Sequence, residues 1–210
     1  MSTSEGPREL LALMGGPPAR ERADAARNRR KVLEAAAALF REHGVEAVSM
    51  DAVAARAEVG KGTLFRRFGD KSGLVAALLD EQERDLQERI LSGPPPLGPG
   101  AGAAERVRAF VAAYADYLFG HLDLLRVSET ASAGARYRIG AYRFWHLHLS
   151  ILLAEARPEA DAGYLAHALL APLAAEHVTA VLRERDPAQI KAGLTGLAAA
   201  VTAGPVSGCS

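Results

Sequence analysis

The sequence has little of what builds disulfides, signal peptides or membrane spans. Its single cysteine, Cys209, lies next to the C-terminus and has no second cysteine to pair with. No apolar run approaches the length that crosses a bilayer, and the apolar part of residues 1–16 is too short for a secretory signal. We therefore expect a cytoplasmic protein without membrane association and without internal disulfides.

The sequence also lacks the motifs on which most enzyme classes depend. It contains no glycine-rich phosphate loop, nucleophile elbow, HExxH or CxxC pair. His146 and His148 would point to different faces of a helix, and His167 and His177 are nearly three helical turns apart. We predict that the protein is not an enzyme, has no metal site and requires no cofactor.

The residues that are abundant favour helices. Apolar residues make up 49% of the chain and aromatic residues only 6%, while Ala, Leu and Arg are frequent. Periodic apolar residues predict helices over 71–91, 104–120, 121–133, 134–155 and 159–184, with Pro94 to Gly100 as a non-helical linker. Pro172 should kink or break the helix over 159–184. Asp186, Pro187 and Gln189 predict a capped start for the final helix. The expected fold is all-α.

The formal net charge is zero but is unevenly distributed along the chain. Arg20 to Ser72 contains 12 Lys and Arg against 8 Asp and Glu, whereas residues 73–210 contain 12 against 15. A difference of this size is weak by itself, because mixed charges usually mark solvated helix faces. It places the positive charge on the segment that carries the motif described next.

Residues Ser49 to Lys71 are typical of two short helices joined by a tight turn. Ser49 is a good N-cap, Val53 and Ala57 share one face of the first helix, and Leu64 and Phe68 share one face of the second. This leaves Lys61, Thr63, Phe65, Arg66 and Arg67 on the outside of the second helix. A basic, exposed second helix of this kind enters the major groove in helix-turn-helix proteins.

The segment from about Arg29 to Leu74 resembles the N-terminal domain of the TetR family of bacterial transcription regulators. The resemblance lies in the helix VLEAAAALFREHG, the segment VAARAEVGKGTLFRRF and the following DKSGL. It departs from the family pattern at Glu58, which must tolerate a left-handed or strained backbone where Gly is common, and at Gly60, which replaces a polar N-cap. The resemblance implies DNA contacts from Arg29, Ser49, Lys61, Gly62, Thr63, Phe65, Arg66 and Lys71.

Two of these positions can be argued further. Phe65 stands where Tyr is more frequent, so it can offer packing or a thymine-methyl contact but no phenol hydrogen bond to phosphate. Lys71 at a helix start opposes the helix dipole, and a bound phosphate would resolve this conflict. The alternative for Lys71 is a solvated surface lysine.

The implied organisation is a disordered tail over 1–22, a three-helix DNA-binding domain over 23–72, a helical effector-binding and dimerisation domain over 73–204, and a tail over 205–210. The last two helices are apolar on several sides and can pack against a second copy as a four-helix bundle. The predicted interface residues are Tyr164, Ala168, Ala171, Ala175, Ile190, Leu194, Leu197 and Val201.

The middle of the second domain concentrates the scarce aromatic residues in two helical stripes. They either line an apolar effector cavity or simply fill the core. The candidate ligand-binding residues are Phe110, Tyr114, Tyr117, His121, Tyr142, Trp145, His146 and Leu149.

The function expected from these features is a homodimeric repressor that binds a pseudo-palindromic duplex and is released by a small, largely apolar effector. An activator or an effector-less regulator with the same DNA-binding domain fits the sequence as well. An all-helical enzyme or binding protein that has lost DNA binding is the third hypothesis, and the basic second helix argues against it.

Overall fold

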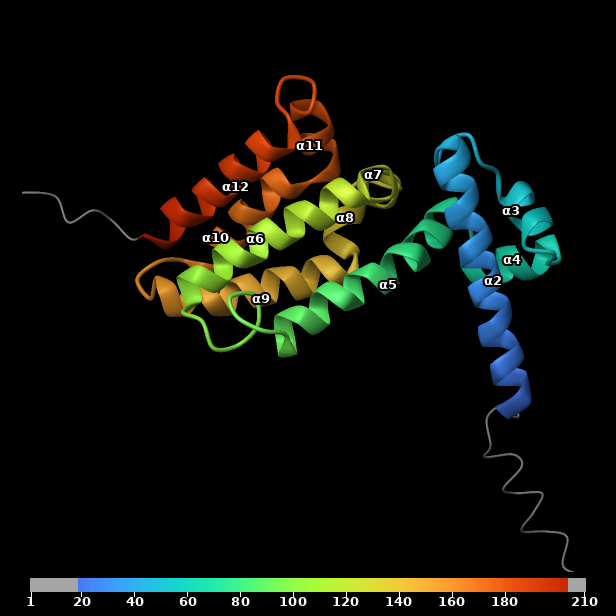
Figure 1. Ribbon diagram of the computed structural model, residues 1–210, viewed down its shortest axis with the longest axis horizontal. Helices are drawn as coiled ribbons and strands as arrows, with labels where there is room; N and C mark the ends of the chain where they lie inside the picture. The colour runs from blue at the N-terminus through green and yellow to red at the C-terminus, as the bar shows by residue number, and fades with distance from the viewer. Residues whose placement is uncertain (1–18, 204–210) are drawn as a thin grey trace, which may run out of the picture. The chain divides into compact units, whose positions relative to one another are not determined.

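The computed structural model describes residues 19–203, and within this range every regular element is a helix, as predicted (Figure 1). The elements in chain order are α2 (Ala19–His43), α3 (Met50–Arg56), α4 (Lys61–Phe68), α5 (Lys71–Ser92), α6 (Ala103–Gly120), α7 (Leu122–Thr130), α8 (Ala135–Arg138), α9 (Gly140–Ala156), α10 (Ala162–Leu170), the 3₁₀-helix η1 (Ala171–Leu173), α11 (Ala175–Val181) and α12 (Pro187–Thr202).

The chain divides into two compact units, the first ending at Gly69 and the second beginning at Asp70. The sequence predicts this boundary after residue 72, three residues later than the structure has it. Helix α2 begins at Ala19, so residues 19–22, which the sequence analysis assigns to a tail, are helical. The predictions for residues 1–18 and 204–210 lie outside the described residues.

The first unit is built from three helices around a small apolar core. Helix α3 packs against both α2 and α4. Ala36 of α2, Val53 of α3 and Leu64 of α4 are at most 1% exposed. Burying a side chain the size of Val or Leu contributes about 1.5–3 kcal/mol, so these contacts fix the position of α4.

The second unit packs six α-helices and η1 around α6 and α9. Helix α6 lies beside α12 and also contacts α9, while α9 packs on α10 and α5 packs on α7 (Figure 1). Its core contains Phe110, Trp145 and Leu149, all at most 2% exposed. Among the described residues, no helix is long and apolar enough to cross a membrane.

Two predicted helices are interrupted in the structure. The prediction of one helix from Gly134 to Glu155 is wrong, because Ile139 has an extended backbone (ψ 132°) that separates α8 from α9. The break lets α8 bury Arg136, whose guanidinium hydrogen-bonds across the domain. The predicted helix over 159–184 breaks into α10, η1 and α11 at Pro172, which lacks the N–H that a continuous helix needs.

The start of α12 agrees with its sequence signals. The Asp186 carboxylate accepts a hydrogen bond from the Gln189 backbone at 2.8 Å, and the Gln189 side chain accepts one from the Asp186 backbone at 3.2 Å. Pro187 occupies the first helical position. This capping box confirms the predicted start of the final helix.

Candidate nucleic-acid interface

Helices α3 and α4 form the predicted helix-turn-helix. Ser49 caps α3, its Oγ accepting a hydrogen bond from the Ala52 backbone at 3.1 Å. Glu58 has a φ of 53°, which confirms the left-handed conformation expected where Gly is common. Gly60 caps α4 with no side-chain hydrogen bond, so this helix start is held by the backbone bonds of the turn.

Helix α4 separates a buried face from an exposed one as predicted. Leu64 and Phe68 are buried at 1% and 8% exposure and anchor the helix on the core. The residues of the opposite face, Lys61, Gly62, Thr63, Phe65, Arg66 and Arg67, are all exposed. Phe65 is 46% exposed, so its ring is accessible to a partner.

The two adjacent arginines of α4 differ in their contacts. The Arg67 guanidinium donates a hydrogen bond to the Ala25 carbonyl of α2 at 2.9 Å and so ties α4 to α2. Within the described part of the chain, Arg66 has no polar partner. Arg66 is therefore free to contact a base or phosphate, whereas moving Arg67 would break a tertiary contact.

Two other predicted DNA-binding cations already have neighbours in the protein. Lys61 pairs with Asp51 of α3 at 2.5 Å, and both side chains are more than half exposed. The Arg29 guanidinium lies over the Phe68 ring, 5.8 Å from its centroid. An exposed ion pair is weak enough for a phosphate to replace Asp51.

Lys71 is the first residue of α5 and thus belongs to the second unit. Asp70 caps this helix, its carboxylate accepting a hydrogen bond from the Gly73 backbone at 2.9 Å. The phosphate contact of Lys71 stays a prediction.

The predicted effector residues of α6 and α9 pack mostly against each other. Ring centroids of Phe110, Tyr114 and Trp145 lie 5.8 Å apart in all three pairs, and Tyr117 contacts both Tyr114 and His121. Leu149 is fully buried beside them. This packing favours the alternative in which these rings fill the core.

Two of the effector candidates instead border an open pocket of about 650 Å³. These are Tyr142 and His146, which the structure brings together with His167 of α10. Residue spacing does not predict that His146 meets His167, because nothing in the sequence places α10 beside α9. Among the described residues, no group of three or more His, Cys, Asp or Glu could hold a metal ion.

The predicted dimer residues do not share one surface. Tyr164, Ala168, Ala171 and Leu197 are exposed, and Val201 is half-buried. Ala175, Ile190 and Leu194 are buried within the single chain, and their assignment to the interface stays a prediction. Helix α12 packs one apolar face on α6, which the apolar periodicity alone cannot distinguish from packing on a partner.

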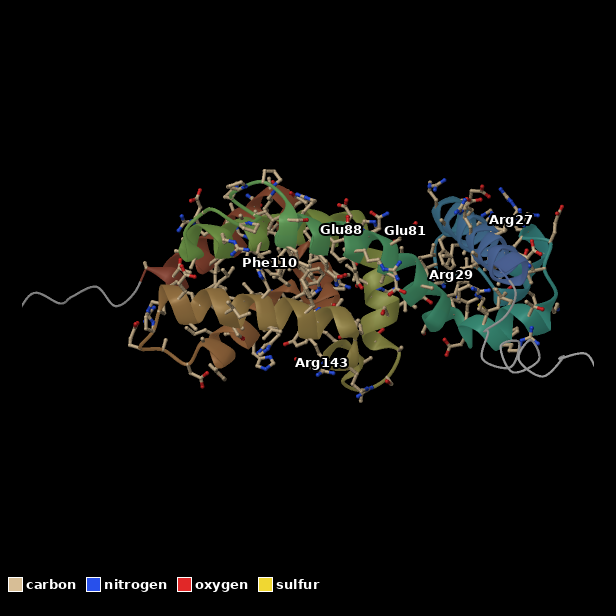
Figure 2. The ribbon with its side chains drawn as sticks, turned by 90° about the horizontal axis from the view of Figure 1, so that it is seen from below. Arg27, Arg29, Glu81, Glu88, Phe110 and Arg143 are labelled. Carbon is tan, nitrogen blue, oxygen red and sulfur yellow. The ribbon has the colours of Figure 1, made fainter. Side chains whose placement is uncertain are left out.

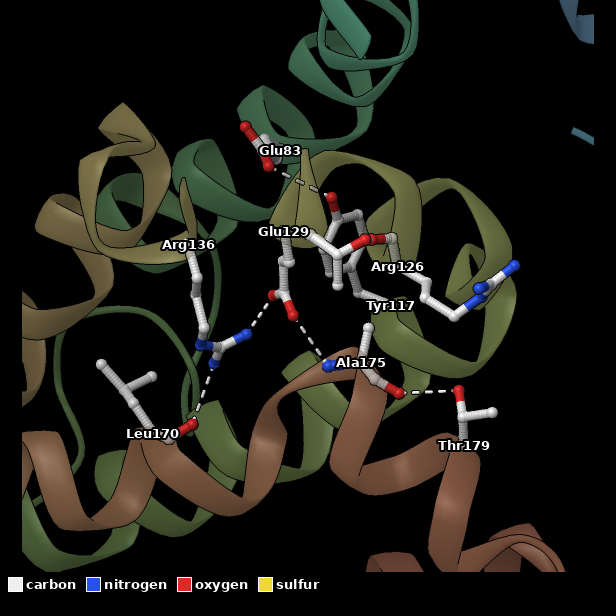
Figure 3. A network of polar contacts seen from close by, with 9 residues as sticks. Glu83, Tyr117, Arg126, Glu129, Arg136, Leu170, Ala175 and Thr179 are labelled. Carbon is white, nitrogen blue, oxygen red and sulfur yellow. Dashed lines mark hydrogen bonds and ion pairs between the residues drawn. The ribbon is translucent and has the colours of Figure 1, made fainter. Parts of the chain in front are cut away.

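A buried polar network in the second unit was missed by the sequence analysis (Figure 3). The Glu129 carboxylate of α7 pairs with the Arg136 guanidinium of α8 and accepts a hydrogen bond from the Ala175 backbone at 2.8 Å. Arg136 also donates to the Leu170 carbonyl at 2.9 Å. Burial raises the pKa of the Glu129 carboxyl, and the positive charge of Arg136 partly offsets this rise. The network therefore joins α7 and α8 to the break between α10 and α11.

A half-buried carboxylate, that of Glu83, lies on α5. Glu83 accepts a hydrogen bond from the Tyr117 hydroxyl of α6 at 3.3 Å, and burial raises the pKa of Glu83 to about 7 (Figure 3). Glu83 is one of many charged residues on this helix, and no spacing in the sequence distinguishes it. Only the packing of α5 in the second unit reveals it.

The DNA-binding segment matches known regulators in sequence. Residues 32–78 match the profile of bacterial regulatory proteins of the tetR family. An HTH-type transcriptional regulator of Staphylococcus aureus is 45% identical over 69 residues, which are 33% of this chain and 36% of that protein. Residues 32–78 thus form a DNA-binding segment of the TetR type.

The likeness to TetR-family structures extends over both units. A TetR/AcrR-family regulator from Thermobifida fusca has a TM-score of 0.60 at 20% identity, covering 85% of this chain and 98% of the other. A regulator from Saccharomonospora viridis, solved in complex with choline, has a TM-score of 0.61 at 19% identity, covering 81% and 95%. At such identities the likeness shows the fold alone.

The sequence matches are confined to one end of the chain. The chain spans about a third of the length of the curated relatives that it matches, through its TetR-family DNA-binding segment. The matched proteins are transcriptional regulators, in agreement with the prediction that this chain is not an enzyme.

Proposed function

We propose that the protein is a homodimeric transcriptional repressor that binds a pseudo-palindromic operator. The observation that carries this proposal is the exposed face of α4, on which Lys61, Thr63 and Arg66 surround the exposed ring of Phe65. Lysine and arginine recognise guanine edges and phosphates, threonine can bond to several bases, and an apolar ring suits the thymine methyl group. These residues fit DNA better than a protein partner.

A homodimer is required by the size of this reading surface. One short helix contacts few base pairs, and each good bidentate contact contributes only about 1–3 kcal/mol of discrimination. Two copies related by a twofold axis would read two half-sites about 34–36 Å apart, or near a multiple of that spacing.

The exposed faces of α11 and α12 support a dimer interface there. A pocket of about 420 Å³ lies between them, with Pro172, His177 and Leu197 among its lining residues. Gly193 and Gly196 of α12 are exposed, and a Cβ atom at either position would meet nothing within 4 Å in this chain. Their smallness is unexplained by packing within one subunit and would allow a second helix to approach closely.

Gly196→Glu tests this interface, because it places a charge there while improving helix propensity. We expect the variant to sediment as a monomer at concentrations at which the unmodified protein is a dimer. Leu91→Glu, at an exposed site on α5, is the matched control and should stay dimeric. A dimer that survives Gly196→Glu would place the interface elsewhere.

Operator binding is tested by selecting bound fragments from a genomic library and sequencing them. We expect an enriched pseudo-palindrome, with affinity that falls steeply with salt. If a folded, dimeric protein enriches no sequence, the proposed repressor function is rejected. The remaining hypothesis is then a binding protein that has lost DNA binding.

The repressor would be released by a small, largely apolar molecule bound in the second unit. The choline complex of the regulator from Saccharomonospora viridis supports small-molecule binding on this fold. The alternative is an activator or an effector-less regulator. Transcription from a reporter carrying the selected operator distinguishes them, since a repressor lowers expression and an activator raises it.

A further inference from the structure

The pocket of about 650 Å³ beside α9 has the size of a small-molecule site. Its lining comes from the α8 to α9 segment and from one residue of α10. Small-molecule sites commonly measure about 300–1,000 Å³. The lining residues are Tyr137, Gly140, Tyr142, Arg143, Phe144, His146, Leu147 and His167.

Flat rings dominate the wall of this pocket. The imidazoles of His146 and His167 come within 3.9 Å of each other, measured between ring centroids. The Tyr137 and Tyr142 rings meet edge to face at 5.1 Å. Tyr137 is 60% exposed and Leu147 is 61% exposed, so apolar surface is available at the mouth. Such a wall favours a planar ligand that can stack on these rings.

Hydrogen bonds hold three of the rings in place. The Tyr142 hydroxyl and His167 Nδ1 lie 2.7 Å apart, and His146 Nε2 donates to the Gly163 carbonyl at 3.1 Å. These bonds cross from α9 to α10 and restrict the ring orientations before any ligand arrives. A preorganised wall reduces the entropy lost on binding.

Arg143 gives the pocket its charge preference. It is the only Lys, Arg, Asp or Glu among the lining residues. Within the described part of the chain, it has no hydrogen-bond or ion-pair partner. Figure 2 shows it on the side of α9 away from the core residue Phe110. A guanidinium can bind a carboxylate through two parallel hydrogen bonds.

We propose that this pocket binds a planar aromatic acid, with the acidic group on Arg143 and the ring system against Tyr137, His146 and His167. The site is distinct from the packed aromatic core of α6. Binding here does not depend on the proposed function. A role as the release signal for DNA does rest on it, and the experiment below measures the two separately.

The test is calorimetric titration of the full chain, without DNA, with 2-naphthoate and with its uncharged amide. We expect the acid to bind roughly five- to tenfold more tightly, because an exposed charged hydrogen bond is partly screened. Arg143→Gln should abolish this preference and leave amide binding unchanged. Arg183→Gln, which removes an exposed arginine that does not line the pocket, should leave the preference intact.

The ring contacts are tested by His167→Ala, which should weaken both probes because one wall of the pocket is lost. Absence of binding by either probe at millimolar concentrations, or a preference for the acid that survives Arg143→Gln, would overturn the proposal. DNA release is then measured by adding 2-naphthoate to the operator complex. Binding without release would leave the site intact and reject only its role in the repressor.

Discussion

One ion pair from each unit shows two opposite environments for charge. In the first unit, Lys61 and Asp51 pair at the surface with side chains 66% and 56% exposed. In the second, Arg136 and Glu129 pair with side chains 9% and 7% exposed. Exposed ion pairs contribute little to stability, whereas removing one partner of a buried pair leaves the other charge buried, unpaired and without hydration. The exposed Lys61–Asp51 pair of the DNA-binding unit can therefore separate at little cost in stability. The arrangement of α7 and α8 in the second unit, by contrast, depends on the buried Arg136–Glu129 pair.

Glu129→Ala is expected to have the largest effect. It leaves the buried Arg136 guanidinium unpaired and the Ala175 N–H without its acceptor, so the free energy of unfolding should fall by about 3–5 kcal/mol. Urea denaturation followed by circular dichroism measures this. Removing both charges in Glu129→Ala/Arg136→Met should recover part of the loss. A loss below about 1 kcal/mol would place this pair with the surface pairs.

Glu83→Gln tests the Glu83 carboxylate of the second unit through the pH dependence of the free energy of unfolding. The folded protein holds the Glu83 proton up to about pH 7, whereas a carboxyl with the ordinary pKa of 4.5 loses it earlier. Stability should therefore be full below pH 4.5 and fall as the pH rises to 7, by about 2–3 kcal/mol at most.

The Gln variant should lack this part of the pH dependence, so its stability relative to the unmodified protein should rise between pH 4.5 and 7. Glu81→Gln, at an exposed position on the same helix, is the control. Parallel stability curves for the unmodified protein and Glu83→Gln would contradict the raised pKa.

Variants of α4 in the first unit, and of Lys71 at the start of α5, are expected to act on DNA binding. Arg66→Ala should cost about 1–3 kcal/mol on the selected operator and relax the preference at one base pair, as should Thr63→Ala to a smaller extent. Lys71→Ala should weaken binding to all sequences and reduce the salt dependence by about one counterion. Fluorescence anisotropy over a salt series measures both. Equal losses on specific and random duplexes for all three variants would refute these roles.

Asp51→Ala should have the smallest effect on stability, below about 1 kcal/mol, because its partner Lys61 stays solvated. Removing the carboxylate also frees Lys61 and reduces repulsion of phosphate, so non-specific DNA binding should tighten. Denaturation and anisotropy on the same sample check the two parts. A stability loss as large as that of Glu129→Ala would contradict the difference in energetic contribution between the exposed and the buried ion pair.

Local signals predicted the first unit well. The N-cap at Ser49, the left-handed Glu58 and the burial of Leu64 and Phe68 all follow from residues close in sequence, because caps, turns and helix faces are set within a few residues. The different contacts of Arg66 and Arg67 could not be predicted, since Arg67 is held by a carbonyl 42 positions away.

Predictions that needed contacts between distant helices succeeded less often. Apolar periodicity marked Ile190 and Leu194 as covered positions, and both are buried within the single chain, in which α12 packs on α6. An apolar helix face predicts that the face is buried, but it does not predict which helix buries it.

The sequence by itself determined the helices, most of their ends and the basic reading face of α4, because these depend on backbone chemistry and on neighbours one or two turns away. Only the tertiary structure decided which charges are buried and which rings line a pocket. The meeting of Glu129 with Arg136 and of His146 with His167 depends on how α7, α8, α9 and α10 pack, and packing joins residues whose separation in the chain carries no periodic signal.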